Sequence, residues 1–78
     1  MSTPLIIYSH ADCELCEKAA GMATMAGVDW IYKDIAEDLN LLRRYRHSIP
    51  VIRNQATEVE LSWPFEEQDI RGLADASS

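Results

Sequence analysis

Two cysteines, separated by two residues and placed shortly after an apolar run, constrain the fold of this chain more than any other feature. Residues 5–8 form a short β-favouring run that is typical of a buried strand. Cys13 and Cys16 follow it, and residues 14–26 carry apolar side chains at helical spacing. A strand, a short loop and a Cys-x-x-Cys that opens a helix are together typical of a thiol redox site.

The spacing of the two cysteines suits nucleophilic chemistry. The thiolate is the reactive form of cysteine, and the free N–H groups and the dipole at a helix N-terminus stabilise it. A Cys13 side chain at the N-cap would face the amides of Leu15 and Cys16, and Cys16 would fall on the same face of the helix. We therefore expect Cys13 to be the exposed attacking thiol and Cys16 to be the more buried resolving thiol.

Charged neighbours of the pair oppose this chemistry. Asp12, Glu14 and Glu17 surround the cysteines and would disfavour a Cys13 thiolate by charge repulsion. His10 is the one nearby group that could offset them. The sequence leaves the balance between these charges open.

Two other interpretations of the cysteines also stay open. Both could be inert residues of a small core, or His10, Cys13 and Cys16 could bind zinc through a His-x-x-Cys-x-x-Cys pattern. A structural zinc site uses four ligands. The only other histidine is His47, and the chain has no third cysteine.

Composition limits the class of protein. The chain has 78 residues, 13 acidic against 7 basic, and a net charge of −6. This size allows one small domain over residues 1–78, and the charge argues against a nucleic-acid partner. No apolar run is long enough to cross a bilayer, and residues 1–4 lack the basic region of a signal peptide. We expect a cytoplasmic monomer that binds neither nucleic acid nor membrane.

The rest of the chain completes an α/β pattern. The elements expected after the first helix are a strand over 28–35, a helix capped by Asp38, strands over 48–53 and 58–61, and a helix over about 65–74 that Pro64 would begin. The first two strands should be parallel because a βαβ crossover joins them, and a hairpin should add the other two. We predict the order β-α-β-α-β-β-α, with a mixed four-stranded sheet covered by helices on both faces.

Two smaller features have structural interpretations. The second helix ends in a basic cluster formed by Arg43, Arg44, Arg46 and His47. A solvated helix end that complements the dipole explains this cluster better than an anion site. Gly21 lies inside the first helix and would allow that helix to pack closely on the sheet.

With these elements in place, the sequence resembles the glutaredoxin-like branch of the thioredoxin superfamily, and especially its small bacterial members. The resemblance covers almost the whole chain. It rests on Cys13-Glu14-Leu15-Cys16 after the first strand, Ser48-Ile49-Pro50-Val51 at the third, and Trp63-Pro64-Phe65 before the last helix. It implies a thioredoxin-like fold and a thiol–disulfide oxidoreductase that acts on protein or small-molecule disulfides.

The resemblance also implies a substrate groove. Pro50 would be cis and lie against the cysteines, and Ile49 would offer its backbone to the substrate as an added strand does. Tyr8, His10 and Trp63 are further residues that could line this groove. For Tyr8 and Trp63, packing in the core or at its rim is the alternative.

Three departures from the glutaredoxin pattern concern glutathione and cofactors. Glutaredoxins usually carry Pro-Tyr between the cysteines, a lysine shortly before them, and a Gly-Gly-x-Asp turn that binds a glutathione carboxylate. This chain has Glu14-Leu15, the loop 10–12 and the segment 62–66 there, and Pro64 has no N–H to donate. No resident cofactor is expected, and glutathione stays a doubtful co-substrate. Two rival functions are a binding module with little turnover and a metal or iron–sulfur carrier that uses Cys13.

Overall fold

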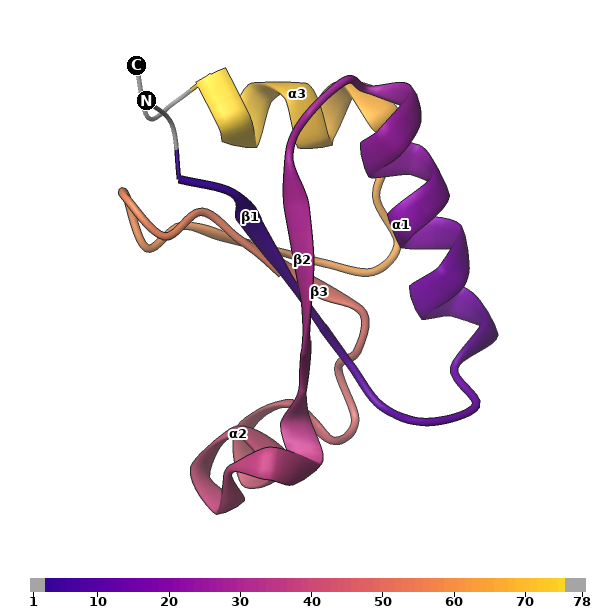
Figure 1. Ribbon diagram of the computed structural model, residues 1–78, viewed down its shortest axis with the longest axis vertical. Helices are drawn as coiled ribbons and strands as arrows, with labels where there is room; N and C mark the ends of the chain where they lie inside the picture. The colour runs from indigo at the N-terminus through magenta and orange to yellow at the C-terminus, as the bar shows by residue number, and fades with distance from the viewer. Residues whose placement is uncertain (1–2, 76–78) are drawn as a thin grey trace.

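The structure, a computed structural model, describes residues 3–75 and has the predicted order of elements (Figure 1). The elements are β1 (Leu5–Ser9), α1 (Glu14–Met25), β2 (Trp30–Asp34), a 3₁₀ helix η1 (Ile35–Glu37), α2 (Leu39–Tyr45), β3 (Val51–Arg53), β4 (Glu60–Ser62) and α3 (Glu67–Asp75). The fold class predicted from the sequence is therefore confirmed.

One mixed sheet runs through the molecule, with strand order β2-β1-β3-β4. β1 and β2 are parallel, as the crossover through α1 requires, while β3 is antiparallel to both β1 and β4. The carboxyl ends of β1, β2 and β4 and the amino end of β3 consequently meet at one edge of the sheet. The N-terminus of α1 also lies towards that edge (Figure 1).

Helices cover both faces of this sheet. On one face, α1 and α3 pack over a core that includes Ile7, Ile52 and Ile70. On the other face, α2 and η1 contribute Tyr45 and Ile35 to a second cluster with side chains of β1 and β3. The two clusters together hold the sheet rigidly beneath its loops.

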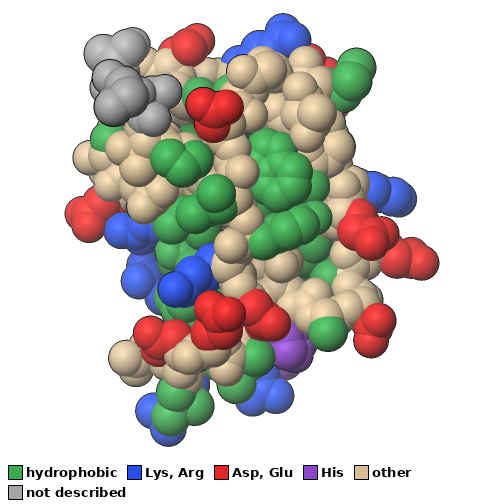
Figure 2. All heavy atoms as spheres, in the orientation of Figure 1, with side chains coloured by type: hydrophobic (Ala, Val, Ile, Leu, Met, Phe, Trp, Pro, Cys, Tyr) green, Lys and Arg blue, Asp and Glu red, His purple; other side chains and the backbone are tan. Residues whose placement is uncertain are grey.

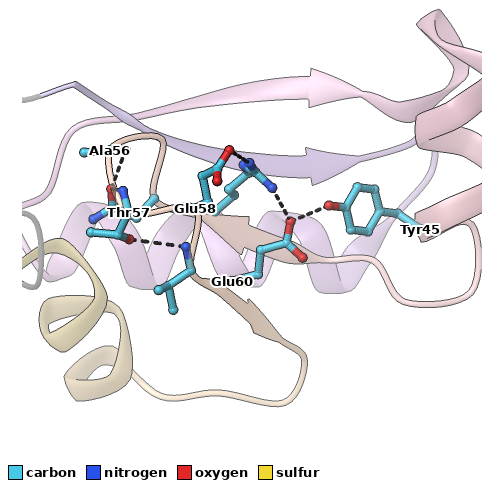
Figure 3. A network of polar contacts seen from close by, with 8 residues as sticks. Tyr45, Ala56, Thr57, Glu58 and Glu60 are labelled. Carbon is cyan, nitrogen blue, oxygen red and sulfur yellow. Dashed lines mark hydrogen bonds and ion pairs between the residues drawn. The ribbon is translucent and has the colours of Figure 1, made fainter.

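A polar network fastens α2 to the far strand of the sheet (Figure 3). The Tyr45 hydroxyl donates a hydrogen bond to the Glu60 carboxylate in β4. Arg53 donates to the same carboxylate with an Nη1–Oε2 distance of 2.9 Å, and to Glu58 with an Nη2–Oε1 distance of 3.1 Å. Tyr45 also stacks on Tyr8 of β1, with 4.5 Å between the ring centroids.

Two expectations from the sequence are wrong in detail. The last helix begins at Glu67 rather than at Pro64 or Phe65, because the Asp69 carboxylate accepts the Glu66 N–H at 2.8 Å and caps the helix there. Gly21 is exposed, and a Cβ atom added to it would meet nothing within 4 Å, so it does not allow close packing on the sheet.

Candidate functional site

A disulfide joins Cys13 and Cys16 at the start of α1, with 5.2 Å between their Cα atoms. Cys13 is the N-cap residue of α1, as predicted, and its backbone is extended at φ −101° and ψ 99°. Its Sγ atom accepts a hydrogen bond from the Cys16 N–H at 3.1 Å. The helix therefore directs a backbone donor at the sulfur that would carry the charge of a thiolate.

The two cysteines differ in exposure. Cys16 is only 2 % exposed, whereas Cys13 is half-buried and reaches the surface. The expected difference in exposure is therefore present, with Cys16 the more buried of the two.

An open cavity of about 460 Å³ gives access to the disulfide. Besides the two cysteines, its lining residues are Ser9, His10, Asp12, Glu14, Glu17 and Tyr32. Among the described residues, this lining includes three carboxylates but no lysine or arginine. Acidic side chains accordingly crowd the edge of the molecule where α1 begins (Figure 2).

His10 is held at the cavity by an acidic partner from the neighbouring strand. Its Nδ1 atom lies 3.1 Å from Oδ1 of Asp34, the last residue of β2. The same oxygen accepts the Ala36 N–H at 2.8 Å and caps η1. The hydrogen bond from the Ala36 N–H and the one from His10 lower the pKa of Asp34, so its carboxylate stays ionised.

The register of the sheet relates Pro50, the buried residue directly before β3, to this site, although Pro50 does not itself line the cavity. Tyr8 pairs with Val51, so extending the antiparallel register by one residue sets Pro50 opposite Ser9, which lines the cavity. On its other side, the Pro50 carbonyl accepts the Trp63 N–H at 3.2 Å. The Ile49–Pro50 and Trp63–Pro64 peptide bonds are both cis.

The structure separates the residues expected to line a groove. His10 lines the cavity with the cysteines. Tyr8 is buried and, with the half-buried Ile49, packs in the cluster around Tyr45. Trp63 packs edge-to-face on Phe65, with 5.1 Å between the ring centroids.

Three residues at the site were not predicted from the sequence. Ser9 and Tyr32 line the cavity, and Asp34 binds His10. The available signal was the parallel pairing of the first two strands, because the carboxyl ends of adjacent parallel strands meet at one edge of a sheet.

Residues 3–75 contain no group of three or more His, Cys, Asp or Glu side chains arranged to hold a metal ion. None of their helices combines the length and apolar character needed to span a bilayer.

Comparison with known proteins gives one family. The model of the glutaredoxin-like domain (DUF836) matches residues 4–73. The X-ray structure of the structural genomics target protein XcR50 from X. campestris is similar, with 31% sequence identity and a TM-score of 0.83, over 95% of this chain and 99% of that chain. The solution structure of the same target has 30% identity and a TM-score of 0.83, over 97% of each chain. No curated protein matches.

The family match spans most of the chain, and the cysteine pair at disulfide distance fits a thiol redox role. The chain belongs to the family of glutaredoxin-like domains within the thioredoxin superfamily.

Proposed function

We propose that this protein is a dithiol–disulfide oxidoreductase in which Cys13 is the nucleophile and Cys16 is the resolving thiol. The observation that carries the proposal is the position of Cys13. Its sulfur accepts the Cys16 N–H at the start of α1 and opens into a cavity, while its disulfide partner is buried. A helix N-terminus stabilises the thiolate needed for attack.

The reaction has two exchange steps. In the reduced protein, the Cys13 thiolate attacks one sulfur of a substrate disulfide, and the other substrate sulfur leaves as a thiolate. Cys16 then attacks the Cys13 sulfur, forms the internal disulfide and releases the second substrate thiol. The short separation of the two cysteines on one helix face supports the second step.

Residues at the same edge of the sheet would receive the substrate. Pro50 lies opposite Ser9 by register and is buried, so it would support the groove from within the fold, whereas His10 lines the cavity itself. The Ile49 N–H already donates to the Tyr45 carbonyl at 3.2 Å, so the Ile49 carbonyl is the group offered to a substrate peptide. Disulfides of proteins or of small molecules are the proposed substrates, and a reducing cytoplasm is the proposed setting.

A binding module with little turnover is the second candidate, and the carboxylates of Asp12, Glu14 and Glu17 favour it. Negative charge around Cys13 disfavours the thiolate and also an anionic co-substrate such as glutathione. The two candidates differ in whether the cysteine pair cycles reversibly.

A redox titration tests the proposal. The protein is equilibrated in glutathione buffers of graded potential, free thiols are alkylated, and the products are weighed by mass spectrometry. A reversible internal disulfide with a midpoint on the order of −200 to −270 mV is expected of a working oxidoreductase. Failure of both cysteines to oxidise reversibly would leave the binding module as the better function.

Single substitutions then test the two roles. Cys13→Ser should abolish disulfide reduction, whereas Cys16→Ser should trap a mixed disulfide on Cys13. Full turnover by Cys16→Ser without an adduct would contradict the assignment. Serine nearly preserves the size of the cysteine side chain but lacks a comparably reactive nucleophile. Circular dichroism checks that each variant is folded, so that a loss of activity can be assigned to the missing thiol.

A further inference from the structure

We propose that His10 and Asp34 form a proton-transfer pair for the exchange at Cys13. His10 would take the proton of the Cys13 thiol and return it to the departing substrate thiolate, and Asp34 would act as its positioning residue. The inference rests on the proposed function and adds how that site handles protons.

The contact between the two residues fixes which ring nitrogen is available. An ionised carboxylate can only accept hydrogen bonds, so the Nδ1 atom that lies 3.1 Å from Asp34 Oδ1 must carry a proton. In a neutral imidazole, the other nitrogen, Nε2, is then an acceptor. Nε2 is therefore the nitrogen that can exchange a proton with a thiol in the cavity that His10 lines.

The fold holds this pair in place. Ser9 and Asp34 are partners in the parallel register of β1 and β2, so His10, the residue after Ser9, leaves the sheet beside Asp34. Asp34 is itself fixed by its 2.8 Å hydrogen bond from the Ala36 N–H. Ser9 belongs to β1 and Asp34 belongs to β2, so the position of the pair does not depend on the loop after β1 alone.

The charges around the cavity make such a pair useful. His10 contacts Asp34 of β2 and shares the cavity lining with Asp12 of its own loop, Glu14 and Glu17 of α1, and Tyr32 of β2. Among the described residues, it is the only side chain in the cavity lining that can become a cation. An imidazolium beside Cys13 would offset the carboxylates at the moment when the thiolate forms.

The step balances without another reactant. The Cys13 S–H proton moves to His10 Nε2, which gives a thiolate and an imidazolium. The thiolate forms a bond to one substrate sulfur while the substrate S–S bond breaks, and its electron pair goes to the departing sulfur. The imidazolium then protonates that sulfur, so His10 returns to its neutral form.

Two uncharged disulfides separate proton donation from simple thiolate formation. Bis(2-hydroxyethyl) disulfide releases a basic alkyl thiolate that needs a proton, whereas 2,2′-dipyridyl disulfide releases a stabilised thione that needs little help. We expect His10→Gln to slow reaction of the reduced protein with the first compound about tenfold or more at pH 7, and with the second clearly less. The matched substitution His47→Gln should slow neither.

Asp34 acts through His10, and a mutant cycle tests that link. Asp34→Asn should slow the alkyl disulfide in the wild-type background but have no further effect in His10→Gln. Asp38→Asn is the control, because Asp38 also caps a helix, through the Asn40 N–H at 2.8 Å, but lies outside the cavity lining. A merely structural Asp34 would instead slow both disulfides equally and add to His10→Gln.

The outcomes separate the two proposals. If the wild-type protein reduces neither disulfide, the proposed function fails. If the wild type reduces both and His10→Gln matches His47→Gln, only the proton-transfer pair is overturned. Equal slowing of both disulfides by His10→Gln would also overturn it, because His10 would then act on the thiolate but not on the leaving group.

Discussion

At the scale of single residues, Tyr45 connects the polar network to the strand that leads into the site. Its ring stacks on Tyr8, which lies directly before the cavity residue Ser9. Its hydroxyl donates to Glu60, which also accepts from Arg53. Burial, with the neighbouring Glu60 carboxylate, raises the pKa of Tyr45 to about 12. The buried ring and its charged partner therefore stabilise each other's native protonation state.

Removing the hydroxyl should weaken the fold. Tyr45→Phe keeps the stacked ring but leaves Glu60 without one donor, so we expect a loss of about 1.5–3 kcal/mol in the free energy of unfolding at pH 7. Urea unfolding followed by circular dichroism measures the difference. Tyr32→Phe is the matched control, because Tyr32 is 47% exposed and should change stability little. Equal stability of Tyr45→Phe and wild type would show that the hydrogen bond from the Tyr45 hydroxyl to Glu60 contributes nothing to stability.

The effect of Tyr45→Phe should also depend on pH. Burial opposes ionisation of Glu60, but hydrogen bonds from Tyr45 and Arg53 outweigh it and lower the pKa of Glu60. A lowered folded-state pKa gives stability that is present above about pH 4.3 and lost as the pH falls further. The raised pKa of Tyr45 gives stability that is present below about pH 10 and lost between there and 12. The difference in free energy of unfolding between the wild type and Tyr45→Phe should thus stay close to its pH 7 value from about pH 5 to 9 and shrink outside that range. An unchanged difference at about pH 3.5 would contradict this account.

At the scale of elements, the two ends of α1 are fixed by different devices. Cys13 caps the N-terminus, and Gly27 follows the C-terminus with φ at +75°, where its N–H donates to the Thr24 carbonyl at 3.1 Å. Residues that carry a Cβ atom are strained in this left-handed region, whereas glycine is not. Gly21, in contrast, lies in the helix interior with open space around it.

The same substitution should therefore have opposite signs at the two glycines. We expect Gly27→Ala to lower the free energy of unfolding by about 1 kcal/mol through backbone strain. Gly21→Ala should raise it by about 0.5–1 kcal/mol, because alanine favours the helix interior. Thermal and urea unfolding of both variants check the signs. Destabilisation by Gly21→Ala would show that a neighbouring group occupies the space that the added Cβ atom needs.

Local signals made α1 and its cap predictable. The prediction of this helix rested on the helical spacing of its apolar residues and on the position of Cys13, and neither depends on distant parts of the chain. The start of α3 was missed because Asp69 reaches back to the Glu66 N–H, a contact that Pro64 masked in the sequence. The partnership of His10 with Asp34 depends on the register of two strands, and a sequence gives strand order more readily than register.

At the scale of the whole molecule, charge is unevenly placed. The chain has a net charge of −6, and acidic side chains gather where α1 begins, beside the disulfide. Basic side chains are spread over several parts of the same view, including the region of α2 (Figure 2), whose last turn contains Arg43 and Arg44. The field at the cavity mouth is therefore negative, and it should sort substrates by charge before any exchange takes place.

We predict a preference for cationic disulfides, given the proposed activity. At low salt, the reduced protein should react fastest with cystamine, more slowly with neutral bis(2-hydroxyethyl) disulfide, and slowest with anionic dithiodiglycolate. The rates with the two charged compounds should differ by about tenfold or more at low ionic strength and converge in ~0.5 M salt, because screening shortens the reach of the carboxylates.

Two variants test whether the carboxylates at the cavity cause this preference. Glu17→Gln, at the cavity, should narrow the difference in rate between the two charged compounds. Glu37→Gln, an exposed residue of η1 outside the cavity lining, changes the net charge equally and should narrow it less. Equal effects of the two variants would assign the preference to net charge alone, and the absence of any preference would remove charge as a selector at this site.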